Sequence, residues 1–304
     1  MHDVVILTER RYINPKKSDS YIDNVLLEDE LVSKALRKKG IHVIRKAWDD
    51  ETFDWTTTKY GLFRATWDYF DRFPEFSNWL KSVSEKTQLI NSKKLIDWNI
   101  DKHYMQDLST KDVHIPRTLF IEPENKTTLN NSIQKAKETL GFIAEDFVLK
   151  PCIAGGARHT YKFHGREYEK YEPIFQELIT QEAMMLQEFQ KNIVAEGEIS
   201  MMVFNGKFTH AILKIAKTGD FRVQDDYGGS VHKYNPTDEE IAFAEKVIQV
   251  TPELPLYARV DIFRDNEERL ALAELEIFEP ELWFRHHPEA ADILASSIKD
   301  RFFQ

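Results

Sequence analysis

Apolar positions in the first third of the chain alternate between short β-branched runs and one long amphipathic segment. Residues 3–7 (DVVIL), 41–44 and 61–63 predict buried strands, and residues 25–39 predict a helix that Gly40 ends. Strands that alternate with helices in this way are typical of a small parallel sheet with helices on its faces. We therefore expect an α/β unit at the start of the chain.

Polar side chains follow the third predicted strand directly. Arg64, Thr66 and Asp68 come just after its carboxyl end, which is where open α/β sheets bind ligands. They are candidates for substrate contacts. The alternative is that Trp67 and Tyr69 are packing residues and that the polar side chains only cap the next helix.

A second pattern begins near residue 113, where both the composition and the order of the elements change. Strands are predicted at 115–121, 147–150, 161–163 and 184–189, and helices at 127–140 and 168–181. The loop at 153–158 contains Gly155 and Gly156, which would let the backbone approach an anion closely. It matches neither the Walker sequence nor the dinucleotide fingerprint, and paired glycines also occur in ordinary turns.

The last third of the chain predicts two hairpins and two helices. An Asn-Gly turn at 205–206 joins strands at 199–204 and 208–215. Thr237 and Glu240 form a capping box for a helix at 237–249, and a second helix is expected at 288–302. The second hairpin joins residues 257–264 to residues 270–278. Together with the parallel sheet, these hairpins indicate a chain of mixed α/β and α+β class.

Three carboxylates are concentrated on this second hairpin. Asp261 shares a strand face with Arg259, and Glu274 and Glu276 share a face of the partner strand. The opposite face of that partner strand is predicted to comprise Ala271, Ala273, Leu275 and Ile277. Carboxylates held this close repel each other unless water, a basic group or a cation compensates, and such oxygen ligands suit Mg²⁺. The alternative is a solvated outer face.

A basic residue earlier in the chain also suggests an anion. A short helix is predicted to begin near Asn99 or Asp101, which would place Lys102 in its first turn. A cation is unfavourable there unless an anion is near, and phosphate is one such anion. Solvent exposure of Lys102 is the alternative.

Composition narrows the class of protein. The chain has 304 residues, 42% hydrophobic and 30% charged, which is enough for two or three domains with packed cores. A net charge of −10 argues against nucleic-acid binding through a general basic surface. Cys152 is the single cysteine, so no internal disulfide can form. We find no signal-peptide pattern and no apolar run long enough to span a membrane, so a cytoplasmic protein without membrane partners is expected.

The order of these motifs resembles the ATP-grasp superfamily, in its glutathione-synthetase-like branch. The motifs are Lys150 before the glycine loop, QEF at 187–189, GEIS at 197–200, Lys214, and Asp261 followed by Glu274 and Glu276. WDYF at 67–70 and WNIDK at 98–102 are similar to segments of relatives of the cycloserine-forming cyclo-ligase. The resemblance covers nearly the whole chain. It implies a Rossmann-like pre-ATP-grasp domain at 1–112, a central ATP-grasp subdomain at 113–184 and a C-terminal subdomain at 185–304.

The resemblance also implies roles for individual residues. The ATP phosphates would be held by Lys102, Lys150, Gly155, Gly156 and Arg158. The adenosine would be bound by Gln187, Glu188, Phe189 and, at the ribose, Glu198, with Glu196 as the alternative. The metal ligands would be Asp261, Glu274 and Glu276, the last standing where glutathione synthetase has asparagine. The transferred phosphate and the acyl intermediate would be contacted by the catalytic residues Lys214, Arg222 and Arg259.

The activity implied is an ATP- and Mg²⁺-dependent ligase. It would activate a carboxylate as an acyl phosphate for attack by an amine or another nitrogen nucleophile, with two Mg²⁺ ions and Mn²⁺ as a substitute. Its substrates would be a small carboxylic acid and an amine, and a homodimer is compatible with the sequence. Two alternatives remain open, an intramolecular cyclo-ligase of the cycloserine-forming type and a non-catalytic ATP-binding regulatory protein.

Overall fold

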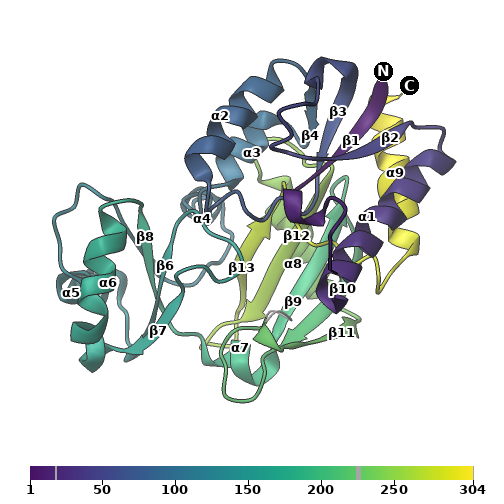
Figure 1. Cartoon of the computed structure of the whole chain (residues 1–304). Coiled ribbons are helices and arrows are strands. Elements are labelled where there is room, and N and C mark those ends of the chain that lie inside the picture. Colours follow the sequence, from purple (N-terminus) through teal and green to yellow (C-terminus); the bar gives the residue numbers. More distant parts are fainter. Residues whose placement is uncertain (18, 224–226, 304) are drawn as a thin grey trace.

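Three sheets organise the chain in the computed structural model, which describes residues 1–17, 19–223 and 227–303. Figure 1 shows the N-terminal sheet lying above the C-terminal one, with the central sheet and its helices set to one side. The two chain ends lie near each other on the N-terminal unit. Predictions of a mixed α/β and α+β fold are thereby confirmed.

The first unit is a parallel sheet in the order β2-β1-β3-β4. Its strands are β1 (His2–Thr8), β2 (Val43–Ala47), β3 (Thr58–Phe63) and β4 (Gln88–Ile90). Its helices are α1 (Ser20–Lys38), α2 (Phe73–Ser84), α3 (Lys93–Asn99) and α4 (Tyr104–Ser109). Short 3₁₀ turns occur at Arg10–Tyr12 and Trp55–Thr57. The predicted strands and long helix are confirmed, whereas α2 and β4 were not anticipated.

The central unit is an antiparallel sheet in the order β5-β8-β6-β7. Its strands are β5 (Thr118–Ile121), β6 (Asp146–Pro151), β7 (Tyr161–His164) and β8 (Met184–Glu188). Helices α5 (Leu129–Leu140) and α6 (Tyr168–Ile179) share its core, and a 3₁₀ turn at Gly165–Glu167 precedes α6. The loop that carries Gly155 and Gly156 therefore joins β6 to β7, as predicted.

The C-terminal unit is a sheet in the order β11-β10-β9-β12-β13. Its strands are β9 (Glu198–Phe204), β10 (Lys207–Ile215), β11 (Ser230–Tyr234), β12 (Tyr257–Arg264) and β13 (Leu270–Glu276). Its helices are α7 (Lys191–Glu196), α8 (Asp238–Gln249) and α9 (Glu289–Phe302). Helix α9 packs on α1, and one core joins Val4 and Ile6 to Met202 and Leu294, so this unit and the first share an interior.

A β-bulge changes the pattern of the acidic hairpin. Asp261 pairs with Glu274 but Ile262 pairs with Leu272, so Ala273 is an extra residue in β13. The prediction that Ala271 and Ala273 continue the apolar face of Leu275 was wrong. Leu270 and Leu272 enter the core before the bulge, and Leu275 and Ile277 enter it afterwards. Strict alternation from Leu275 back through Ala273 fails because the extra residue shifts the face.

Side chains from the first unit occupy the outer edge of β13. The amide of Asn99 donates to the Leu275 carbonyl (2.7 Å) and accepts from the Ile277 N–H (2.9 Å). The Tyr104 hydroxyl accepts from the Leu275 N–H (2.8 Å), and the Asn91 amide donates to the Ile277 carbonyl (2.7 Å). These bonds fix the strand that carries Glu274 and Glu276 against the first unit.

The predicted domain boundaries at 112/113 and 184/185 stay predictions. We propose that the second boundary lies after Glu188, because β8 pairs with β5 and β6 and so completes the central sheet. In the part of the chain that the structure describes, no helix has the length and apolar character needed to cross a membrane.

Candidate active site

A cavity of about 330 Å³ lies between the three units. Its walls include fourteen of the fifteen site residues predicted from the sequence, and the exception is Arg158. The carboxylates Asp261, Glu274 and Glu276 all reach it from β12 and β13. Residues that are far apart in the sequence are thus brought to one place.

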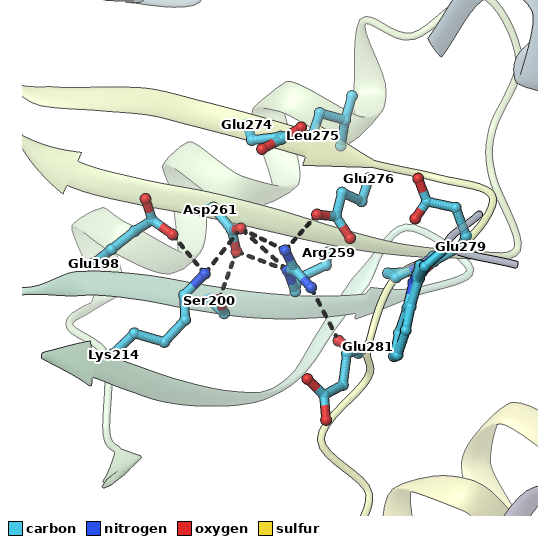
Figure 2. A network of polar contacts seen from close by, with 12 residues as sticks. Glu198, Ser200, Lys214, Arg259, Asp261, Glu274, Leu275, Glu276, Glu279 and Glu281 are labelled. Atoms are coloured by element: carbon cyan, nitrogen blue, oxygen red, sulfur yellow. Dashed lines mark hydrogen bonds and ion pairs between the residues drawn. The ribbon is translucent and has the colours of Figure 1, made fainter. Parts of the chain in front are cut away.

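Asp261 is the centre of a buried polar network (Figure 2). Its carboxylate accepts from Arg259 Nη2 at 2.9 Å and from Ser200 Oγ at 2.5 Å, and it lies 3.1 Å from Lys214 Nζ. Burial alone would raise the pKa of Asp261, but the positive charges of Arg259 and Lys214 outweigh it and hold the pKa at about 2. Asp261 is therefore ionised at neutral pH.

Arg259 and Lys214 each bridge Asp261 to a second carboxylate. The Arg259 guanidinium lies 2.5 Å from Glu276, and the Lys214 ammonium lies 2.5 Å from Glu198. Burial raises the pKa of Glu276 well above its ordinary value despite Arg259, and the carboxylates of Glu279 and Glu274 add to the increase. The carboxylates in this part of the cavity outnumber the two cations, Arg259 and Lys214, that pair with them.

Lys102 connects the glycine loop to the third carboxylate. Its ammonium donates to the Ala154 carbonyl (2.5 Å) and lies 2.9 Å from Glu274. Helix α4 begins at Tyr104, so the prediction that Lys102 lies in the first helical turn was wrong by two residues. Lys102 is buried and its backbone N–H donates to Cys152, which excludes the alternative of solvent exposure.

Lys150 points into the same cavity from the end of β6. Burial lowers its pKa, the carboxylate of Glu274 opposes that change, and the charge of Lys102 adds to it. Among the described residues, no carboxylate forms an ion pair with its ammonium. Lys150 is thus a cation available for an anionic ligand.

Residues 187–189, at the end of the neighbouring strand β8, form another part of the wall. Gln187 donates to Thr118 Oγ1 (2.7 Å), and the Glu188 carboxylate accepts from the Ala144 N–H (2.8 Å), so both side chains are held by the protein. The Phe189 ring carries the Lys162 ammonium 3.6 Å from its centroid. The wall therefore offers an aromatic surface beside a fixed backbone.

The two arginines predicted at the phosphates have protein partners in this structure. Arg158 donates to Glu182 (2.8 Å) and lies 3.3 Å from Asp71. Arg222 lines the cavity, donates to Asp220 (2.7 Å) and lies 3.7 Å from the centroid of the Tyr227 ring.

The candidate substrate contacts Arg64, Thr66 and Asp68 do not line this cavity. Arg64 is buried and donates to the Pro280 carbonyl, Thr66 is buried, and Asp68 accepts from Trp48 and Arg72. These side chains contact other parts of the protein, but none of them caps the next helix, α2, whose N-cap residue is Arg72, so the alternative that they are helix caps was also wrong. Trp67 packs against Tyr12 and Tyr21, as the alternative expected, and it also lines the cavity.

Several wall residues were missed as site candidates because isolated aromatic and acidic residues carry no spacing signal. They are Arg11, Tyr21, Trp67 and Phe70 from the first unit, and Glu281 after β13. Glu279 and Trp283 also line the cavity, which agrees with the expectation from the resemblance that they form a wall of the metal site. Burial raises the pKa of Glu279 to about 7, and the negative charge of Glu274 adds to the increase. Glu279 therefore changes charge near neutral pH.

Comparison with known proteins identifies the family. Residues 101–277 match the RimK-like ATP-grasp domain, which is more than half of the chain. The chain belongs to the RimK-like ATP-grasp family. As a member of this family it is an ATP-dependent carboxylate–amine ligase that uses ATP and Mg²⁺, and these predictions are confirmed.

Individual relatives agree with this assignment to the RimK-like ATP-grasp family. Residues 4–91 match the N-terminal domain of the D-cycloserine synthetase DcsG. The cycloserine biosynthesis protein DcsG of Streptomyces lavendulae is 26% identical over 284 residues, which are 88% of this chain and 91% of that protein. The crystal structure of D-cycloserine synthetase DcsG has a TM-score of 0.84 at 22% identity, with 98% of this chain and 99% of that one covered.

A second structural neighbour extends the comparison to a nucleotide complex. D-alanine–D-alanine ligase from Bacillus anthracis, complexed with ATP, has a TM-score of 0.67 at 12% identity and covers 99% of this chain and 97% of that one. The ATP-grasp fold predicted from the order of motifs is confirmed.

Proposed function

We propose that this RimK-like ATP-grasp ligase binds Mg·ATP in the cavity between its units and phosphorylates a small carboxylic acid there. The observation that carries the proposal is the meeting of Lys102, Lys150 and three carboxylates in one cavity that the glycine loop borders. Lys150 supplies a free positive charge to the phosphates. Lys102 supplies a second one, beside the loop.

We assign the adenosine of ATP to the part of the cavity wall formed by residues 187–189. Phe189 packs on the base, and the backbone of residues 188–190 bonds to its edge, because the side chains of Gln187 and Glu188 are already engaged. Glu198 binds the ribose, after exchanging its bond with Lys214 for one with a hydroxyl. Arg158 holds the loop through Glu182 and Asp71 and does not reach the phosphates.

The carboxylates fit a magnesium site. Asp261, Glu274 and Glu276 offer oxygen ligands only, and the raised pKa of Glu276 marks negative charge that a cation would stabilise. Two Mg²⁺ ions would share this set with the phosphates, and Mn²⁺ would substitute. When bound, the ions neutralise phosphate charge and fix the phosphates in line with the attacking oxygen.

The protein then acts by position and charge. A carboxylate oxygen of the acid attacks the γ-phosphorus, the bond to ADP breaks, and an acyl phosphate forms. Arg259, Lys214 and Arg222 neutralise the charge that develops on the transferred group. The nitrogen nucleophile attacks the acyl carbon, inorganic phosphate leaves, and the proton from nitrogen passes to a base.

Isotope transfer tests this proposal. The purified protein is incubated with Mg·ATP and pools of amino acids and small carboxylic acids whose carboxylates carry ¹⁸O. Substrate-dependent release of ADP and of phosphate that contains one ¹⁸O is the expected result, because the acyl phosphate passes that oxygen to phosphate. ADP release without ¹⁸O in the phosphate would contradict the acyl phosphate.

The mass of the product separates ligation from cyclisation. Ligation gives the sum of two substrates less water, whereas cyclisation gives one substrate that has lost water or ammonia. The family assignment does not favour cyclisation over ligation. A homodimer and a cytoplasmic location stay predictions.

A further inference from the structure

The segment 67–71 of the first unit touches both halves of the ATP site. The indole of Trp67 donates to the Glu279 carbonyl (2.9 Å), close behind the acidic strand β13. Phe70, three residues later, lines the cavity on the side of the glycine loop. The first unit thus reaches the loop that we assign to the phosphates.

Phe70 packs directly on Gly155. A Cβ atom added to Gly155 would lie 2.8 Å from Cε1 and 3.2 Å from Cδ1 of the Phe70 ring. Gly155 is outside the group of residues with positive φ, so the backbone itself would accept alanine. Its neighbour Gly156 is the opposite case, with a φ of +54° and open space around it. A side chain at position 155 would therefore require the Phe70 ring to move.

Further contacts hold the same loop on both sides. Asp71 lies 3.3 Å from Arg158 at the end of the loop, next to Phe70 in sequence. From the C-terminal unit, the Tyr227 hydroxyl donates to the Gly156 carbonyl (2.9 Å). The loop is therefore held between the first unit and a segment that follows β10.

We propose that Phe70 is a positioning residue, which sets the place of the glycine loop over the ATP phosphates by packing on Gly155. This inference rests on the proposed function, since it takes the loop to be the phosphate contact. Phe70 itself touches no reacting atom in this scheme. The ring holds the loop amides where the phosphates need them, and the absence of a side chain at position 155 allows this close contact.

A double-mutant cycle tests the contact. Phe70→Ala, Gly155→Ala and the double variant are compared with the wild type by calorimetric titration with Mg²⁺ and a non-hydrolysable ATP analogue. We expect each single change to weaken binding of the analogue about five- to tenfold, and the double variant to be no weaker than Phe70→Ala. The methyl group at 155 should cost nothing further once the ring is gone.

Adenosine separates positioning from loss of structure. It occupies the wall at residues 187–189 without using the loop, so its affinity should stay within twofold in all three variants. Phe73→Ala is the matched control, because Phe73 packs in the same core of the first unit but does not line the cavity. It should leave both affinities unchanged.

The possible outcomes separate a failure of the role proposed for Phe70 from a failure of the proposed nucleotide site. Strictly additive losses, an unchanged analogue affinity in Phe70→Ala, or equal losses for adenosine and the analogue would each overturn the role of Phe70. A wild-type protein that binds neither the analogue nor adenosine would instead overturn the proposed nucleotide site.

Discussion

Lys102 Nζ lies 2.9 Å from Glu274 Oε1, and this ion pair joins the segment before α4 to the strand that carries the proposed metal ligands. The positive charge lowers the pKa of Glu274 although burial opposes that change. The pair keeps a carboxylate ionised in a cavity crowded with negative charge. In the proposed site, Lys102 would therefore divide its charge between Glu274 and the ATP phosphates, whereas Lys150 would interact with the phosphates alone.

Lys150→Ala should therefore weaken ATP binding strongly. A charge-assisted hydrogen bond contributes about 1.5–3 kcal/mol, so the Kd for Mg·ATP should rise about 10- to 100-fold. Isothermal titration measures this change. Lys126→Ala removes an exposed lysine of the same unit and should leave the Kd within twofold. An unchanged Kd in Lys150→Ala would contradict the phosphate role.

Glu274→Gln should raise the Mg²⁺ concentration required for half-maximal activity by about tenfold or more, because a neutral amide is a weaker ligand for a hard cation. The measurement is ADP release as a function of Mg²⁺ at saturating ATP. Glu267→Gln changes an exposed carboxylate in the turn of the same hairpin and should behave as the wild type. Equal Mg²⁺ requirements in both variants would refute Glu274 as a ligand.

Arg259→Ala should destabilise the fold itself. It leaves Asp261 and Glu276 without their guanidinium partner in a buried site, a change that typically costs about 3–5 kcal/mol in the free energy of unfolding. Urea unfolding measures the loss, and added Mg²⁺ should restore part of it by replacing the missing charge. Arg264→Ala, which breaks a surface pair with Glu239, should cost less than about 1 kcal/mol. A loss of that small size in Arg259→Ala would show that the network does not need its arginine.

Acid should destabilise the chain through His210. Burial lowers the pKa of His210 to about 4, while its Nε2 donates to the Leu282 carbonyl at 2.8 Å. Its pKa in the unfolded chain is about 6.5, so the unfolded state binds more protons between these values. Stability from His210 is complete above about pH 6.5 and falls by about 3 kcal/mol as the pH drops to about 4.

The variant His210→Gln isolates this effect, because glutamine keeps a donor for Leu282 but does not titrate. Burial raises the pKa of Glu9 to about 7, so acidification increases the contribution of Glu9 to stability. This contribution is the same in the wild type and in His210→Gln. The difference between the two urea-unfolding curves should therefore shrink on acidification from pH 7 to pH 4. A difference that is constant with pH would contradict the assignment to His210.

The order of strands and helices was predictable because most elements carry local signals. The Asn-Gly turn, the Thr237 capping box and the β-branched run of β1 each specify their element within a few residues. The cluster of Lys150, Asp261 and Glu274 was predictable only through the order of motifs. No local pattern brings Lys150 of β6 and Glu274 of β13 to one cavity, because that arrangement depends on how the units pack.

The sequence alone could not predict at which residue β13 changes the face that it buries, or which distant residues Arg64 and Trp67 contact. The bulge at Ala273 depends on the pairing of β12 with β13, so alternation within one strand cannot locate it. The burial of Arg64 depends on the Pro280 carbonyl, and the exposure of Trp67 to the cavity depends on Glu279. The contacts of Arg64 with Pro280 and of Trp67 with Glu279 each join residues more than 200 positions apart in the sequence. Local spacing contains no information on contacts of this kind.

The side chains along the outer edge of β13 have a consequence for contacts between molecules. An edge strand with unused N–H and C=O groups is a template on which another chain can add a strand, and so aggregate. Asn91, Asn99 and Tyr104 occupy those groups from Leu275 to Ile277. Growth of this sheet by strand addition is blocked there, and β11 at its other end is the edge at which a second molecule could extend it.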